Sequence, residues 1–230
     1  MIPAAPLSAA LALGFLLGVR HALDADHLAA VAALASGERR LGRSMLLGTF
    51  WGAGHTTALL AAAVVVNIFR IAIPPEIEGA LEKGVAVMLM ILGAHVLLRA
   101  VSGVRMHGHT HGHDGVAHAH VHLHGASDDS HTHHHLLRLG RRPFLVGLVH
   151  GLAGSAALML LALAAMPSPI AAVLYVALFG LGSTAGMLVI SGLVGLPFAL
   201  AARRAGVAEL ALRVLAGAAS LVLGAVLLHA

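Results

Sequence analysis

The stretch "FLLGVRHALDADHLAAV", from Phe15 to Val31, carries five ionisable side chains within eight residues of an otherwise apolar segment. Such groups cost about 2.5 to 3.5 kcal/mol each inside a membrane on insertion scales, and they are usually tied to a function there. On a regular helix His21, Asp24 and His27 share one face, whereas Asp26 points elsewhere. We expect Arg20 to pair with one of the aspartates. The stretch therefore predicts a polar site inside a hydrophobic span.

The composition indicates an integral membrane protein. Of the 230 residues, 59% are hydrophobic and 10% are charged, and the apolar share lies above the roughly 45 to 50% of globular proteins. The basic residues are scattered arginines rather than one block, so we expect no nucleic-acid partner. The chain has no cysteine, which excludes disulfides and thiolate metal sites. Any metal ligands must be His, Asp, Glu, Met or backbone groups.

The hydrophobic segments predict an all-α polytopic fold. About 20 apolar residues cross the roughly 30 Å hydrocarbon core, and six segments meet this requirement: 6–35, 44–69, 81–103, 143–166, 169–196 and 208–229. The first segment is overlong. A break between Gly18 and Asp26 would divide it into a span plus a re-entrant helix, giving a seventh segment.

The arginines predict the orientation in the membrane. Nine of them fall in alternate loops: Arg39, Arg40, Arg43, Arg105, Arg138, Arg141, Arg142, Arg203 and Arg204. Cytoplasmic loops carry an excess of Lys and Arg. We therefore expect a multi-pass protein of the cell (inner) membrane, with both termini outside and the long loop 104–142 in the cytoplasm.

The chain contains an internal repeat. A shift of 129 residues aligns Phe15, Gly18 and His21 with their counterparts in "FLVGLVH", which begins at Phe144 and ends at His150. A shift of 128 aligns "GAGHTTALL" with "GLGSTAGML", and a shift of 131 aligns "LGAHVLL" with "LGAVLLH". A repeat of three helices has inverted topology, as in many transporters. We predict two inverted three-helix repeats, 1–103 and 143–230, joined by the loop 104–142.

The polar residues of the spans are candidate metal ligands. Imidazole and carboxylate groups suit Ni(II), Co(II), Cu(II) and Zn(II). His55 in the second span is a further candidate, and His150 occupies the repeat position of His21. An alternative is an internally paired polar cluster around Arg20 with no metal. The candidate set is His21, Asp24, Asp26, His27, His55 and His150.

Three motifs resemble one transporter family. "HALDADH" resembles the H-x4-D-H signature of the nickel/cobalt transporter superfamily (NiCoT/NicO), through His21, Asp26 and His27. "GAGHTT" resembles its second signature, and "HGLAGSAAL", from His150, is similar to the urease-accessory membrane protein (UreH-type) branch.

This resemblance implies passage of Ni(II) or Co(II) as transported substrate, without an organic cofactor. It also implies that His21, Asp26 and His27 are essential, with Asp24 and His55 in support. Because the signature includes Asp26, we expect the segment to be unwound there, or Asp26 to support the metal ligands without binding the metal itself. The partners implied are cytosolic metal chaperones or the maturation proteins of urease or hydrogenase.

The long loop is rich in histidine. Twelve of the eighteen histidines lie between Met106 and Leu136, mostly alternating with Gly, Ala or Thr. Such a tract cannot form a hydrophobic core and is typical of disordered metal-binding segments. The alternative is a linker without a function of its own.

The combined features predict a transporter of Ni(II) or Co(II), most simply an importer, using the His and Asp side chains within the membrane. Efflux is an alternative with the same features. A membrane-bound metalloenzyme is an alternative of another class. The chain contains no H-E-x-x-H motif of the kind that fixes catalytic zinc on a helix, so we expect no enzymatic activity.

Overall fold

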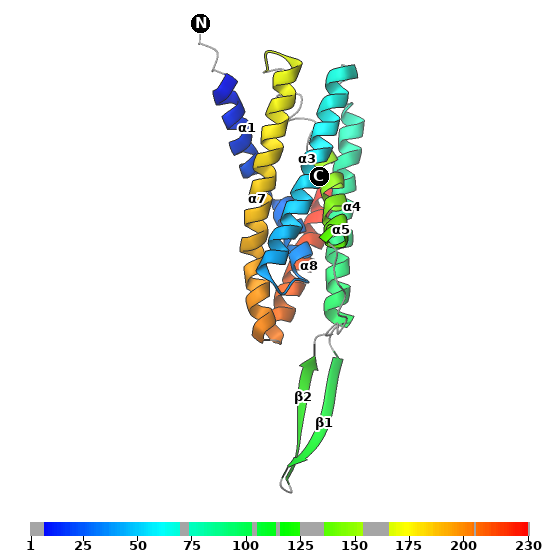
Figure 1. The fold of residues 1–230 in the computed structure, drawn as a ribbon. Coiled ribbons are helices and arrows are strands. Elements are labelled where there is room, and N and C mark those ends of the chain that lie inside the picture. Colours follow the sequence, from blue (N-terminus) through cyan, green and yellow to red (C-terminus); the bar gives the residue numbers. More distant parts are fainter. Residues whose placement is uncertain are drawn as a thin grey trace.

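The computed structural model describes residues 7–69, 74–102, 105–113, 116–124, 136–153, 166–204 and 206–229. Long helices form a bundle, and a β-hairpin projects from one end of it (Figure 1). The elements in chain order are α1 (Leu7–His21), α2 (Ala25–Ala35), α3 (Leu41–Phe69), α4 (Pro75–Ser102), β1 (Arg105–His113), β2 (Val116–His124), α5 (Leu136–Ala153), α7 (Pro169–Arg204) and α8 (Val207–His229).

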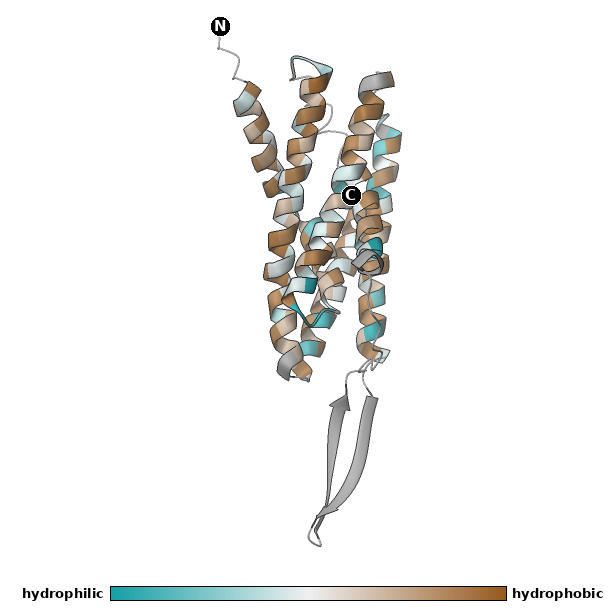
Figure 2. Ribbon diagram, viewed as in Figure 1, coloured by the Kyte–Doolittle hydropathy of each residue, from teal (hydrophilic) through white to brown (hydrophobic). Residues whose placement is uncertain are grey.

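The helices confirm a multi-pass membrane protein. Four of them are long and apolar enough to cross a membrane: Leu41–Val66, Glu76–Ser102, Pro169–Ala202 and Val207–His229. The bent pair α1–α2 gives a fifth span if it is counted as one. Hydrophobic residues predominate along these helices in Figure 2. Of the predicted span 143–166, α5 covers the beginning, while 154–165 lie outside the described residues, so the total of six stays a prediction.

The overlong first segment is broken where the charged stretch lies. α1 ends at His21 and α2 begins at Ala25, and their axes differ in direction by 56°. Asp24 sits at the N-cap of α2 in an extended conformation, with φ −63° and ψ 149°. Aspartate favours this position because its side chain competes with the helical backbone and its charge suits the helix N-terminus. The expected unwinding is therefore present.

Arg20 does not pair with an aspartate, contrary to our expectation. Its side chain is exposed, and within the described residues it forms no ion pair. The reason is that imidazoles occupy both carboxylates: Asp24 contacts His21, and Asp26 contacts His27 and His150.

Glycines bring the two halves of the chain into close contact. α3 packs against α5 and α7, α1 packs against α7, and α4 packs against α8. Among the described residues, eight glycines lie so near a backbone oxygen of the other half that a methyl group would overlap it. The four nearest are Gly18 at Phe179, Gly147 at Trp51, Gly54 at Phe144, and Gly182 at Phe15. Small residues allow this approach, which favours van der Waals contact between helices in a membrane.

A polar contact joins α3 and α7 at the level of these glycines. The hydroxyl of Thr56 donates to the carbonyl oxygen of Gly180 at 2.8 Å, and Thr56 Oγ1 lies 2.9 Å from Thr184 Oγ1. Gly52 packs against Thr184, just as Gly180 packs against Thr56. The two helices thus present equivalent surfaces to each other.

The His-rich loop contains a hairpin where we expected disorder. β1 and β2 pair antiparallel, with Arg105 opposite His124 at one end and His113 opposite Val116 at the other. Histidine alternating with small residues has a period of two, which is also the period of a β-strand. The rest of the tract, 125–135, lies outside the described residues.

The glycine contacts make a prediction about stability. Gly147→Ala should lower the thermal midpoint in detergent, because overpacking a close contact costs about 1 to 3 kcal/mol. Gly84→Ala in α4 is the control, since nothing lies within 4 Å of a methyl group there and alanine favours a helix by about 1 kcal/mol over glycine. Equal midpoints for the two variants would contradict this account of the packing.

Candidate metal centre

The break between α1 and α2 gives two histidines different supports. His21 is the last residue of α1, and His27 lies in the first turn of α2. A pair of turns connects them, with the Leu23 N–H donating to the Arg20 carbonyl and the Asp24 N–H donating to that of His21. As a result the two rings meet edge to face, with centroids 4.4 Å apart.

Two further histidines approach from α3 and α5. The ring of His55 lies 5.3 Å from that of His27 and 5.4 Å from that of His21. The ring of His150 lies 4.2 Å from that of His27 and 6.0 Å from that of His55. We call His21, His27, His55 and His150 the imidazole cluster. Its members come from both halves of the chain, and His27 lies at its centre.

Asp26 links two members of the imidazole cluster. Its Oδ1 accepts hydrogen bonds from the backbone N–H and from Nδ1 of His27, both at 2.9 Å. Its Oδ2 accepts a hydrogen bond from His150 Nε2 at 3.0 Å. A carboxylate in this position fixes the orientation of an imidazole and raises its basicity towards a metal.

Asp24 contacts the cluster only at its edge. Its Oδ2 lies 2.8 Å from His21 Nδ1, and 55% of its side chain is exposed, against 29% for Asp26. A regular helix would have placed Asp24, and not Asp26, beside both His21 and His27. The break instead leaves Asp24 beside His21 alone and places Asp26 beside His27 and His150.

Several nitrogen atoms of the cluster are buried without a hydrogen-bond partner. Among the described residues these atoms are His27 Nε2, His150 Nδ1 and both ring nitrogens of His55. The three side chains are almost wholly inaccessible to solvent. An unsatisfied buried polar group costs about 1 to 3 kcal/mol. These nitrogen atoms are therefore available as ligands for a metal ion.

Two overlapping groups have the spacing needed for a metal ion. One consists of His21, His27 and His55, and the other of Asp26, His27 and His150. In each group the ligand atoms lie within 4.8 Å of one another. Imidazole with carboxylate is a donor set suited to Ni(II), Co(II), Cu(II) and Zn(II). The six predicted site residues thus lie together, with Asp24 outside both groups.

Two aromatic residues beside the cluster were absent from our sequence prediction. The ring of Trp51 lies 5.3 Å from that of His27 and 5.5 Å from that of His150. The ring of Phe179 lies 5.3 Å from that of His21. A signal was present, because the shift of 128 that aligns the Gly52 and Gly180 stretches also pairs Trp51 with Phe179, one residue earlier.

Comparisons with known proteins identify relatives. The family model NicO, described as high-affinity nickel-transport protein, matches residues 7–226. The urease accessory protein UreH of Bacillus sp. (strain TB-90) is 33% identical over 194 residues, which cover 84% of this chain and 79% of that protein. No solved structure matches the chain.

Two other relatives are matched over less of their length. The cobalt transport protein NhlF of Rhodococcus rhodochrous is 37% identical over 98 residues, 40% of this chain and 26% of that protein. The chloroplast protein FOR GROWTH AND FERTILITY 2 of Arabidopsis thaliana is 27% identical over 176 residues, 76% of this chain and 44% of that protein.

The different positions of the two aspartates predict different effects of their removal. Asp26→Asn should weaken Co(II) binding by about 10- to 100-fold, the usual effect of losing a carboxylate that orients a metal-ligating histidine. Asp24→Asn should weaken it less, since Asp24 contacts only His21. Calorimetric titration of chains lacking residues 107–135, which removes the loop histidines, would measure this. A larger loss in Asp24→Asn would favour the regular-helix arrangement instead.

Proposed function

This chain belongs to the NicO family of high-affinity nickel-transport proteins, and we propose that it imports Ni(II) or Co(II) through the imidazole cluster and Asp26. It is a transporter and not an enzyme. The assignment of the site rests on one observation. Buried imidazole nitrogens without hydrogen-bond partners lie together at a break in a helix of a membrane protein.

The cluster suits a transported divalent ion because its ligands replace water. An ion leaving water needs several donor atoms at once, and neutral imidazoles supply them without adding net charge to the membrane interior. The single carboxylate of Asp26 offsets part of the ion's charge. Asp24 stands at the exposed edge, where it orients His21 and attracts a cation to the cluster.

The sharing of His27 supports a stepwise passage. The group of His21, His27 and His55 receives the ion first, and the group of Asp26, His27 and His150 receives it next. Because His27 belongs to both groups, the ion keeps one ligand while the others exchange. Weak binding at several sites allows an ion to leave as well as to enter.

We further propose that the membrane part consists of two inverted repeats. The reciprocal contacts support this: Gly18 meets Phe179 as Gly147 meets Trp51, and the repeat shifts of 129 and 128 residues relate the members of these pairs. Transporters of this build hold their substrate near the midplane, between the repeats. The imidazole cluster joins residues of both halves, in agreement with that design.

The proposed orientation puts the His-rich loop in the cytoplasm and both termini outside, in the cell membrane. In Figure 1 the hairpin lies at the same end of the bundle as the beginning of α3 and the end of α7. Those helix ends adjoin Arg39, Arg40 and Arg43, and Arg203 and Arg204, so the positive-inside rule assigns this end to the cytoplasm.

In the cytoplasm the loop would collect ions that leave the membrane site. Unprotonated imidazoles bind borderline divalent ions and exchange them. The name of the urease accessory relative makes urease maturation proteins, or other cytosolic metal chaperones, the proposed recipients.

Proteoliposomes provide the test of transport. The wild-type protein should carry Ni(II) or Co(II) with saturation, and His27→Ala should lower the initial rate by at least about 10-fold, because both ligand groups lose a member. His95→Ala is the matched control, since His95 is exposed on α4 and belongs to neither group. Absence of saturable flux in the wild type would overturn the function, and equal rates in the two variants would overturn the site.

Deletion of residues 107–135 separates a transporter from the alternative of a metal-dependent enzyme in the loop. The deleted chain should keep saturable flux in proteoliposomes, because the imidazole cluster lies wholly outside the loop. In cells the wild-type chain should raise nickel content and nickel sensitivity. Lower content and greater tolerance would assign it to efflux.

A further inference from the structure

Two aromatic side chains contact the imidazole cluster at different histidines. Phe179 contacts His21, which belongs to the first ligand group, and Trp51 contacts His27 and His150, which form the second group with Asp26. Trp51 is 0% exposed and Phe179 is 4% exposed. Each buried ring therefore packs against a different part of the ligand set.

The two aromatic residues occupy equivalent positions in the two halves of the chain. Trp51 precedes "GAGHTT" and Phe179 precedes "GLGSTA". A glycine of the opposite half packs on the backbone of each, Gly147 on Trp51 and Gly18 on Phe179. α3 and α7 run in opposite directions through the bundle (Figure 1). The equivalent positions of Trp51 on α3 and Phe179 on α7 are therefore displaced towards opposite ends of the bundle.

Each aromatic ring belongs to a separate cluster of buried apolar residues. Trp51 is packed with Val31, Leu89, Met187 and Ile190, among others. Phe179 is packed with residues of another cluster: Leu59, Ala63, Tyr175 and Val176. Apolar constrictions exclude water and thereby block a hydrated ion. These apolar residues thus cover the buried part of the imidazole cluster, whereas the side chains of Asp24 and Asp26 remain 55% and 29% exposed.

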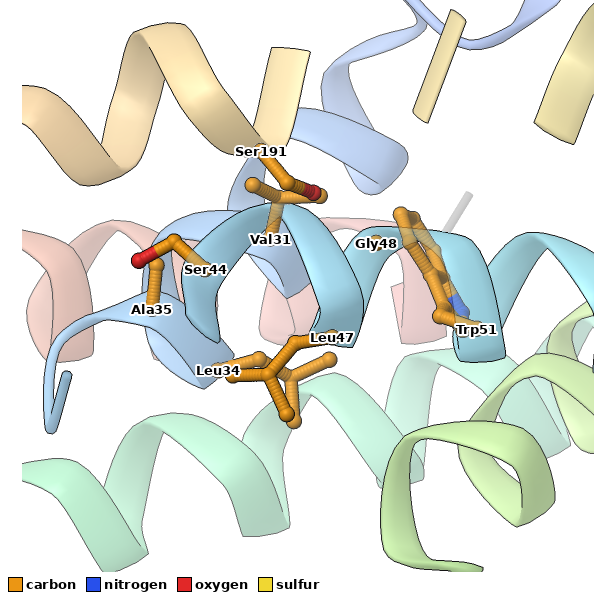
Figure 3. Close-up of a pocket in the computed structure, with 8 residues that line it drawn as sticks. All are labelled: Val31, Leu34, Ala35, Ser44, Leu47, Gly48, Trp51 and Ser191. Carbon is orange, nitrogen blue, oxygen red and sulfur yellow. The ribbon is translucent and has the colours of Figure 1, made fainter. Parts of the chain in front are cut away.

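Trp51 also lines a small pocket between α2, α3 and α7, which is too tightly packed to hold a water molecule in this conformation. Its lining includes Trp51 at one end and two buried hydroxyl groups, those of Ser44 and Ser191 (Figure 3). Trp51 Nε1 and Ser44 Oγ are both buried without a hydrogen-bond partner. An indole or an ion that moved into this pocket would find oxygen atoms there, whereas the rest of the lining is apolar.

We propose that Phe179 and Trp51 are the two gates of the ion path, Phe179 on the side of the chain termini and Trp51 on the side of the arginine-rich loops. They open in turn, so that the ligand groups are never exposed to both sides at once. This proposal rests on the transport function proposed above and adds the residues that prevent leakage.

The test is passive leakage of Ni(II) from loaded proteoliposomes. The double variant Trp51→Ala/Phe179→Ala should leak at least about 10-fold faster than the wild type, while each single variant stays within about 2-fold because the other gate still closes. Trp51→Phe should restore the seal when it is combined with Phe179→Ala. Leakage that adds simply from two leaky single variants would overturn the proposal.

Phe198 provides the matched control. It lies on the same helix as Phe179 and is equally buried, at 5% exposed, but packs with Ala35 and Ala216. The double variant Trp51→Ala/Phe198→Ala should remain tight. Equal leakage from this control would mean that loss of packing, and not loss of a gate, causes the leak. A wild type without saturable flux would instead overturn the transport function itself.

A second measurement avoids large substitutions. The chain has no cysteine, so Ser191→Cys introduces a single thiol in the pocket behind Trp51. An impermeant thiol reagent on the arginine-rich side should label it faster when Ni(II) is present, because movement of Trp51 during transport enlarges the pocket that Trp51 and Ser191 both line, and the same reagent on the other side should not label it. A labelling rate that Ni(II) leaves unchanged, or labelling from both sides, would overturn the proposal.

Discussion

The structure depends on the need to satisfy polar groups that lie inside a membrane protein. A carboxylate and four imidazoles would each be costly in hydrocarbon. Here Asp26 is held by His27 and His150, and the remaining ring nitrogens of these two histidines are buried without a hydrogen-bond partner. Such an arrangement is stable only if helices approach closely on every side. The glycines that line α1, α3, α5 and α7 permit that approach.

The break between α1 and α2 turns this constraint into a site. If the first segment were one straight helix, Asp26 would lie on a different face from His21 and His27. The bend of 56° and the extended Asp24 bring Asp26 to His150 on α5 and bring His21 against α7. Broken helices at the centre of transporters serve the same purpose, since they expose ligands without exposing unsatisfied backbone to lipid.

The two halves of the chain contribute unequally to the same architecture. Reciprocal glycine contacts preserve the packing in both halves, whereas the polar chemistry is concentrated in the first: His55 corresponds to Ser183, and Trp51 corresponds to Phe179. The proposed duplication would account for two equivalent packing surfaces. The candidate ligands lie mostly in the first half, with His150 as the contribution of the second half.

The sequence by itself determined the membrane class, the family and the candidate ligands, because hydropathy and a compact polar motif are local properties. All six predicted site residues lie in or beside the imidazole cluster. The expected pairing of Arg20 with an aspartate was wrong. The contacts of Asp24 and Asp26 could not be predicted from the sequence, because a regular helix would place Asp24, and not Asp26, beside the histidines. Only the tertiary structure decided these points and revealed Trp51 and Phe179, because both depend on how α1, α3, α5 and α7 meet across long sequence separations.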